Sequence, residues 1–265
     1  MALLDCTSFI FDGVDLKSFG MMIGWFDGTE NDLGTGLTRT IIETEMNSIR
    51  SKPSQYATVY EGCLEFSFGI FKSNGDPISY AESRTINKWL TDPKHYRKLV
   101  FPGEQNIYYM AICTDIVDVI YNGHNGKNIV FRTDSPFGYT SPITKTINVL
   151  GSKKLKLFND GDDGSYYPIL SISSISDDIV IKNVTDNQSM ILSFKDLDSR
   201  VIIVDNERMR ITDSDNKLIP VYKIGWDNLD NIYWFRLLQG KNEIEIEGDC
   251  TFTITASFPR KVGMV

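Results

Sequence analysis

The chain has 265 residues, 42% hydrophobic and 23% charged, which is enough apolar material for one large core or two ordinary ones and excludes wholesale disorder. Its net charge is −8, shared by both halves, so it lacks the basic surface that a nucleic-acid backbone requires. No apolar run reaches the roughly 20 residues of a membrane helix and no basic secretion signal opens the chain, so we expect synthesis and retention in a cytoplasm, without membrane anchoring.

The first part of the chain is predicted to form short strands joined by tight turns. Asp12–Gly13 and Asp27–Gly28 favour hairpin turns between strand-like residues. The segment Thr29–Pro53 is polar and bears glycines, so we expect either a mobile loop or an arm that packs on a neighbouring molecule. Its apolar residues, the candidate contacts of such an arm, are Leu33, Leu37, Ile41, Ile42 and Met46.

A strand is predicted over Cys63–Phe71, where apolar and polar residues alternate. Leu64, Phe66 and Phe68 fall on one face of this strand, because successive side chains of a strand point to opposite sides. That face is therefore expected to be buried.

A helix is predicted to begin after Ser79, because Ser79 and Glu82 have the spacing of a capping box. Three apolar residues recur at helical spacing and should pack the helix onto a core. These helix-packing residues are Ile86, Trp89 and Leu90. The helix is expected to end at Asp92–Pro93.

Further strands are predicted up to residue 140, with breaks at Pro102–Gly103 and Asn122–Gly126. Serine, threonine, proline and glycine gather between Thr140 and Ser152, a composition typical of a domain boundary. We therefore expect two domains, residues 1–145 and residues 146–265.

The second domain shows the more regular strand pattern. Ile244 and Ile246 alternate with glutamates, and Phe252, Ile254 and Ala256 alternate with threonines. Short strands with one apolar face, separated by turns about every ten residues, are typical of an antiparallel β-sandwich.

A cluster of acids at Asp160, Asp162 and Asp163 invites comparison with a calcium loop. An EF-hand reading from Asn159 puts Gly161 at the third ligand position and Leu170 where the bidentate glutamate belongs, so the match fails. We expect a turn between strands that holds no metal.

Catalytic and cofactor signatures are missing from the sequence. It has no nucleophile elbow, phosphate-binding loop, dinucleotide fingerprint or paired zinc histidines, and nothing singles out one pair of carboxylates. The single cysteines Cys6, Cys63, Cys113 and Cys250 are expected to be small buried side chains rather than metal ligands. We therefore predict no catalytic residue, no cofactor and no enzyme activity.

Aromatic residues of the second half allow two interpretations. Tyr166–Tyr167, Trp226 and Tyr233–Trp234 could stack on sugars or fill a sandwich core. If residues 231–235 form a strand, Tyr233 and Trp234 point to opposite faces, so one of them is expected to be exposed or at an interface.

Several stretches, taken in order, resemble the distal tail protein of long-tailed siphophages. They are FSFGIFKSNGDPISYAESRTINKWL, YYMAICTDIVDV, NGKNIVFRTDSPFGYT and NDGDDGSYYPILSIS, with LLQGKNEIEIEGDCTFTITASF near the end. Arg84, Ile86, Trp89 and Leu90 match the helix of that family. The similarity covers nearly the whole chain and is weakest over Thr29–Pro53.

This resemblance implies a mainly β protein with two β-sandwich domains. Residues 1–145 would be the ring-forming (belt) domain, with one α-helix and a protruding hairpin arm, and residues 146–265 a galectin-like domain. Six copies would form a ring at the end of a non-contractile tail, joining the tail tube protein to a tail-associated lysin-like hub protein and a receptor-binding protein. DNA would pass through the lumen only as cargo, and the protein would reside at the virion tail tip after synthesis in the host cytoplasm.

Two other classes of function stay open at this point. The second domain could act as a carbohydrate-binding module at the host surface, which requires an exposed aromatic platform. A cell-wall hydrolase would require two facing carboxylates in a cleft.

Overall fold

The computed structural model describes residues 6–24, 38–45, 53–103, 106–121, 124–226 and 232–261. The chain divides into two compact units, Met1–Tyr139 with Arg260–Val265, and Thr140–Pro259. The boundary between the units falls at Tyr139–Thr140, a few residues before the predicted boundary at residue 145. It lies there because residues 143–149 already form a strand of the second unit. As expected from the sequence, the fold is mainly β, and the chain has two domains.

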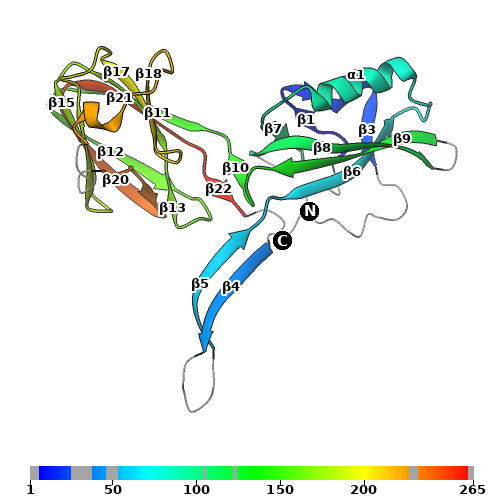
Figure 1. The fold of residues 1–265 in the computed structure, drawn as a ribbon, viewed down its shortest axis with the longest axis horizontal. Coiled ribbons are helices and arrows are strands. Elements are labelled where there is room, and N and C mark those ends of the chain that lie inside the picture. Colours follow the sequence, from blue (N-terminus) through cyan, green and yellow to red (C-terminus); the bar gives the residue numbers. More distant parts are fainter. Residues whose placement is uncertain are drawn as a thin grey trace. The chain divides into compact units, whose positions relative to one another are not determined.

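The first unit is built on one antiparallel sheet (Figure 1). Its strands run in the order β2-β1-β7-β8-β9-β6-β3, with β10 and β22 pairing beside β8. The bounds are β1 Ile10–Phe11, β2 Val14–Asp15, β3 Met21–Gly24, β6 Glu65–Lys72, β7 Arg97–Val100, β8 Ile107–Tyr121, β9 His124–Thr133, β10 Gly138–Thr140 and β22 Pro259–Arg260. A 3-10 helix, η1, covers Leu16–Phe19.

This sheet folds over on itself around an aromatic core. β1 and β9 are not neighbours in the sheet, yet the ring centroids of Phe11 and Phe131 lie 5.0 Å apart. At the other end of the path, the backbone N–H of Ile23 donates to the carbonyl of Thr7, just before β1. A single hydrogen-bonded sheet thereby encloses a core as two packed layers would.

The predicted strand at residues 63–71 is confirmed as β6. Leu64, Phe66 and Phe68 are buried, while Glu65 and Ser67 are exposed. The alternation decides which face of β6 enters the core, because turning the other face inward would place the phenylalanine rings in solvent.

The predicted helix is confirmed as α1, Tyr80–Thr91 (Figure 1). Ser79 is its N-cap, and the reciprocal hydrogen bonds with Glu82 complete the capping box. The ammonium of Lys72 on β6 lies 2.8 Å from the Glu82 carboxylate, and this contact together with the Ser79 hydrogen bonds lowers the pKa of Glu82 to about 2. The helix start is thereby fixed to the sheet as well as capped.

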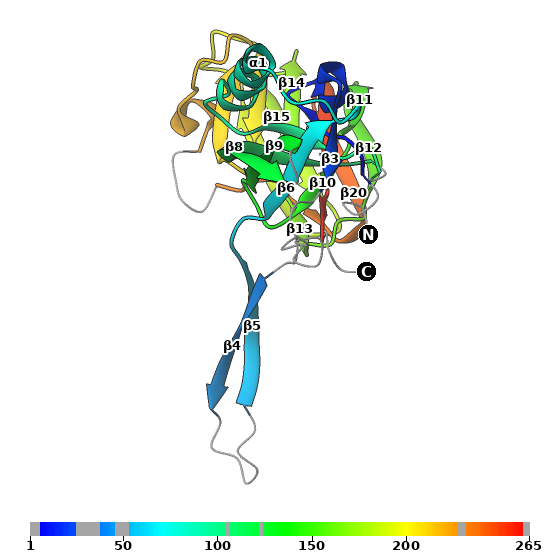
Figure 2. The same ribbon diagram turned by 90° about the vertical axis from the view of Figure 1, so that its right-hand side faces the viewer.

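A second, separate sheet of the first unit is the hairpin of β4, Thr38–Glu45, and β5, Pro53–Glu61. Figure 2 shows it as a twisted two-stranded ribbon. Strand β4 lies within Thr29–Pro53, the polar segment predicted to be a loop or an arm. Strand β5 begins at Pro53, the last residue of that segment, and extends beyond it.

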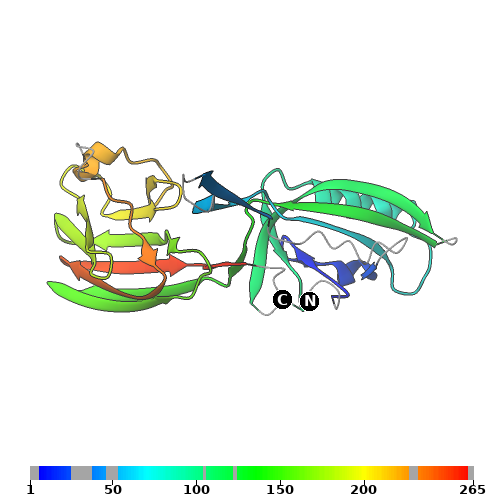
Figure 3. The same ribbon diagram turned by 90° about the horizontal axis from the view of Figure 1, so that it is seen from below.

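The second unit is a β-sandwich whose two layers are visible in Figure 3. One layer has the order β11-β21-β14-β17-β18 and the other β12-β20-β15-β16. The bounds are β11 Ile143–Val149, β12 Ser152–Asn159, β14 Ile169–Ser174, β15 Asp178–Asn183, β16 Gln188–Ser193, β17 Val201–Asp205, β18 Arg210–Asp213, β20 Gly240–Glu247 and β21 Cys250–Ala256. A short pair, β13 Ser165–Tyr166 with β19 Leu237–Leu238, and the 3-10 helix η3, Val221–Ile224, complete the unit.

The alternation predicted for residues 243–256 is confirmed, but the prediction that these two strands form a hairpin is wrong, because β20 and β21 lie in different layers of the sandwich. Ile244 and Ile246 of β20 and Phe252, Ile254 and Ala256 of β21 are all buried in the sandwich core. Each of these strands contributes one apolar face, and the partner sheet covers it.

The expectation that residues 231–235 form a strand is wrong for the part the structure describes, because residues 232–235 form no strand. Tyr233 and Trp234 both pack against the core, and the Trp234 ring meets Trp226 edge to face with centroids 5.1 Å apart. An irregular backbone is free of strict alternation, so neighbouring side chains can turn to the same side.

Loss of the α1 cap is the first testable consequence. Ser79→Ala leaves backbone N–H groups of the first turn without an acceptor, and we expect it to lower the free energy of unfolding by about 1 kcal/mol. Ser83→Ala, inside the same helix, is the matched control and should be neutral or slightly stabilising. Urea unfolding followed by circular dichroism measures both; equal effects would contradict the capping role.

Candidate functional site

The hairpin of β4 and β5 is the candidate assembly site. Its register pairs Ile41 with Thr58 and Ile42 with Ala57, and a bulge follows between Ile42 and Glu43. β-branched residues dominate β4, which suits an extended backbone. The bulge increases the twist of the ribbon.

Of the five predicted arm contacts, the structure places two in this hairpin. Ile41 is 42% exposed and Ile42 is half-buried, both on β4. Leu33, Leu37 and Met46 lie outside the described residues. Within the described ranges neither β4 nor β5 pairs with a third strand, so each keeps one free edge.

A two-stranded hairpin with an exposed isoleucine is poorly stabilised on its own. Isolated hairpins are marginal in water, and unpaired edges favour pairing with other chains. The short pair β13 and β19 differs, because Leu237 is fully buried in the core and Tyr166 packs on it. Among the described residues, the hairpin of β4 and β5 therefore presents two unpaired strand edges and an exposed isoleucine.

The three predicted helix residues lie in the core of the first unit rather than on a binding surface. Ile86 and Leu90 are fully buried, and Trp89 packs beside them on Phe9 and Phe19. The indole N–H of Trp89 donates to the carbonyl of Phe11 at 3.2 Å. The helix is thus joined to β1 by both packing and a hydrogen bond.

A shallow groove lies between α1 and β8, lined by Asn87, Thr91 and residues 113–116. The buried Oδ1 atom of Asn87 has no hydrogen-bond partner. Burial raises the pKa of the Cys113 thiol to about 11, so this cysteine is protonated at neutral pH and is a poor nucleophile.

The cysteine expectation is partly wrong, since Cys6 and Cys250 are buried but Cys63 and Cys113 are only half-buried. All four are free thiols.

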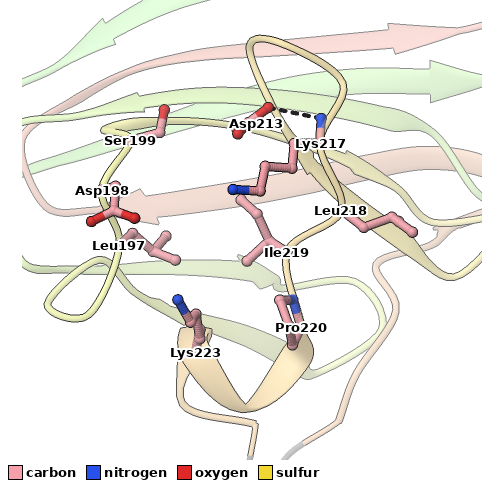
Figure 4. A pocket seen from close by; sticks show the side chains of 9 residues that line it. All are labelled: Leu197, Asp198, Ser199, Asp213, Lys217, Leu218, Ile219, Pro220 and Lys223. Atoms are coloured by element: carbon pink, nitrogen blue, oxygen red, sulfur yellow. Dashed lines mark hydrogen bonds between the residues drawn. The ribbon is translucent and has the colours of Figure 1, made fainter.

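A pocket of the second unit lies between the segment after β16 and the segment around η3 (Figure 4). Figure 4 shows Asp198, Lys217 and Lys223 around its opening. The Asp213 carboxylate accepts hydrogen bonds from the backbone N–H groups of Asp215 and Lys217, so it stabilises the turn that follows β18. With no aromatic ring in its lining, the pocket does not provide a stacking surface for a sugar.

Tyr233, one of the aromatic residues that suggested glycan binding, is held by a polar cluster that sequence reasoning missed. Arg236 donates to both carboxylate oxygens of Asp186, at 2.8 and 3.0 Å, and the Tyr233 hydroxyl donates to the same carboxylate at 3.0 Å. These contacts hold the pKa of Asp186 below its usual range. They tie residues 232–236 to the turn between β15 and β16.

The acidic stretch is a turn between β12 and β13. Gly161 donates to the side chain of Asn159 at 2.9 Å, Asp162 donates to the carbonyl of Pro259 at 3.0 Å, and the Asp163 carboxylate accepts from Gly164. A Cβ at Gly161 would lie 2.9 Å from the Asn159 side chain, so this position requires glycine. Among the described residues, no group of three acidic, cysteine or histidine side chains could hold a metal ion.

The geometry defines a two-domain β protein with a hairpin arm that is unpartnered among the described residues. No helix of the described chain is long and apolar enough to cross a membrane. Two family models match the chain, one described as phage tail protein N-terminal domain over residues 4–135 and one as phage tail C-terminal domain over residues 137–256. The chain therefore belongs to this family of phage tail proteins.

A solved structure shares the fold over nearly the whole chain. It is the Dit (gp 19.1) protein of phage SPP1, described as a paradigm of hub adsorption apparatus in Gram-positive infecting phages. The TM-score is 0.65 at 12% sequence identity, covering 95% of this chain and 98% of that one. No curated protein sequence matches the chain. The family confirms that the chain is a phage tail protein, and the fold is the one found in the SPP1 Dit protein.

The cluster at Asp186 leads to a pH-dependent prediction. Because the folded pKa is lowered, the contribution of Asp186 to stability is complete above the ordinary pKa of about 3.9 and is lost as the pH falls through the folded value. Asp186→Asn should cost about 1–3 kcal/mol at pH 7 and progressively less below pH ~4. Thermal unfolding at both pH values measures this, with exposed Asp196→Asn as the control; a pH-independent difference would contradict it.

A metal test follows from the turn at Asp160–Asp163. Its backbone is closed by protein hydrogen bonds, so we expect EDTA to leave the melting temperature unchanged. Differential scanning calorimetry with and without chelator checks this. A large drop that calcium restores would show that the turn holds a required ion.

Proposed function

We propose that this protein is a ring-forming hub at the distal end of a long non-contractile phage tail. In this role it is a structural part of the virion and not an enzyme. The observation that carries the proposal is the hairpin of β4 and β5, a ribbon with two free edges and an exposed Ile41. Membership of a phage tail protein family and the shared fold with the SPP1 Dit protein support it.

The hairpin provides a physical route to a ring. An arm that packs on the next copy makes a head-to-tail contact, which must close on itself or grow into an open filament. Closure at six copies is the expectation for a distal tail protein. Residues 1–145 would form the ring and its arm, and residues 146–265 would form a galectin-like domain.

The remaining partners follow from the position of such a ring. It would join the tail tube protein to a tail-associated lysin-like hub protein and to a receptor-binding protein. DNA would pass through the lumen as cargo. The net charge of −8 fits a channel wall that repels DNA rather than retaining it.

Carbohydrate binding is the weaker candidate. Trp226, Tyr233 and Trp234 pack on the sandwich core, and the hydroxyl and indole groups of Tyr233 and Trp226 are engaged by Asp186 and the Ile191 carbonyl. These rings therefore do not form the exposed platform that a glycan site requires.

The test is the solution mass of the purified chain over a concentration series, by light scattering, with negative-stain images of the same peak. We expect a six-fold ring for the wild type and its loss in Ile41→Asp, because a charge at the arm contact cannot be buried unpaired. Ile191→Asp, at an exposed isoleucine of the second unit, is the matched control and should keep the ring.

Melting temperatures equal to wild type would show that both variants fold. An unchanged ring in Ile41→Asp would remove the arm assignment. A wild-type monomer at every concentration would contradict a self-closing ring and make a cell-wall pull-down the next experiment.

A further inference from the structure

The pocket drawn in Figure 4 has an apolar floor. Leu197, which follows β16, and Ile219, which follows β18, are half-buried and pack against the sandwich core. Pro220 and Leu218 complete the apolar lining, and Leu218 is 62% exposed. The cavity volume is about 60 Å³, several times the roughly 10–15 Å³ that one water molecule requires. An aliphatic group of the size of a valine side chain therefore fits into it.

Hydrogen bonds within the chain fix both walls of this pocket. The Asp213 carboxylate closes the turn after β18, and the backbone N–H of Ile219 donates to the carbonyl of Ile211 at 2.9 Å. On the opposite wall, the Ser199 hydroxyl donates to the carbonyl of Val201 at 2.9 Å. Because the walls are already ordered, less free energy is lost to ordering them when a ligand binds.

Three charged side chains stand around the opening of the pocket. Figure 4 shows the ammonium groups of Lys217 and Lys223 pointing toward the pocket, with the Asp198 carboxylate on its other side. Among the described residues none of these three groups takes part in an ion pair, whereas Lys195 of the same unit pairs with a carboxylate at 2.7 Å. Charges more than about 8 Å away are largely screened at physiological ionic strength. The two lysines, rather than the net charge of −8, therefore decide which ligand the pocket attracts.

These groups define the chemistry of a matching ligand. The two ammonium groups only donate hydrogen bonds and require an anion, whereas the Asp198 carboxylate only accepts and requires a donor. The apolar floor requires an aliphatic group directly beside both. The last residue of a polypeptide carries a carboxylate, an N–H and a side chain on the same carbon atom, so an aliphatic last residue meets all three requirements. An internal aspartate or glutamate lacks the aliphatic group, and an internal valine or leucine lacks the anion.

We propose that this pocket binds the C-terminal residue of a partner protein. The aliphatic side chain of that residue enters the floor beside Leu197 and Ile219. Its carboxylate contacts the ammonium groups of Lys217 and Lys223, and its backbone N–H donates to Asp198. Capture of a terminal carboxylate is a recurring mode of peptide recognition. A single chain and a ring would carry the same site, so the proposal goes beyond ring formation and does not require it.

The size of the pocket limits the strength of this binding. Ion pairs between exposed groups contribute little, and a single small aliphatic side chain supplies the only sizeable burial. We therefore expect an isolated terminal peptide to bind with a Kd on the order of 1 mM. A dilute free ligand would leave such a site largely empty. A partner that other contacts already hold would fill it, because its terminus then has an effective concentration in the millimolar range. This difference favours a protein terminus over a free amino acid that carries the same groups.

The experiment measures peptide binding to the full chain by ligand-observed saturation-transfer NMR, which works for a single chain and for a large assembly. Acetyl-Gly-Val should bind saturably, with the strongest saturation at the valine methyl groups. Acetyl-Gly-Val amide, which lacks the carboxylate, should bind about three- to tenfold more weakly. Acetyl-Gly-Gly, which lacks the aliphatic side chain, should bind at least about tenfold more weakly.

Variants assign the binding to the two lysines. Lys217→Met combined with Lys223→Met removes both charges and keeps the apolar side-chain stems. This double variant should bind acetyl-Gly-Val about three- to tenfold more weakly and bind its amide as the wild type does. Lys241→Met, at an exposed lysine of β20, is the matched control and should change neither. Added salt should weaken binding of the acid but not of the amide, which tests the charge contact even if the double variant proves unstable.

Equal binding of the acid and the amide at every salt concentration, or no binding of acetyl-Gly-Val at tens of millimolar, would overturn the proposal. Free valine that binds at least about tenfold more tightly than acetyl-Gly-Val would identify a free amino acid as the ligand and overturn the protein terminus. The outcome is separate from the arm test. A ring that binds no peptide contradicts only this site, whereas a chain that binds the peptide and never closes into a ring contradicts only the self-closing ring.

Discussion

Backbone hydrogen bonding is the constraint on which this structure depends. A strand must pair both edges or protect them, and must bury at least one face. The main sheets of both units bury their apolar faces within the chain, by folding over an aromatic core in the first unit and by stacking two layers in the second. Among the described residues, the hairpin of β4 and β5 contributes to neither core, and the proposed assembly role rests on this difference.

The cores explain why such an arm can be tolerated. In the first unit, Phe131 of β9 is surrounded by three rings, with Phe9 edge to face, Phe11 tilted and Phe68 stacked. The helix α1 closes this core with Ile86 and Leu90. Each unit has its own contiguous set of buried side chains. Among the described residues, neither core includes a residue of the hairpin of β4 and β5, so both cores are complete without it.

The second unit shows how one sandwich can carry two different surfaces. Along each strand, the residues that point inward must be apolar because they fill the core, whereas the residues that point outward are free to vary. On one layer that freedom is used for lysine and glutamate, which keep a face in water, and on the other for threonine and serine. The difference is chemical rather than architectural, since both layers use the same strand geometry.

The sequence by itself determined the elements whose signals are local. The capping box at Ser79, the period of the helix that follows, and the alternation in residues 63–71, 243–247 and 251–256 each depend on residues a few positions apart. The resemblance to phage tail proteins was likewise readable from ordered stretches of sequence. Ile41 and Ile42 were identifiable as arm residues because they lie in a long segment with little else to bury.

Only the tertiary structure decided the features that join distant residues. The pairing of Asp186 with Arg236, the irregular course of residues 232–236 and the continuation of the arm into β5 have no local signature. The outward hydroxyl side chains of one sandwich layer are the clearest case, since Thr146, Thr253 and Ser171 become neighbours only through strand order and register. Alternation shows which residues of a strand share a side, but which strands lie together depends on long-range contacts that a single sequence does not display.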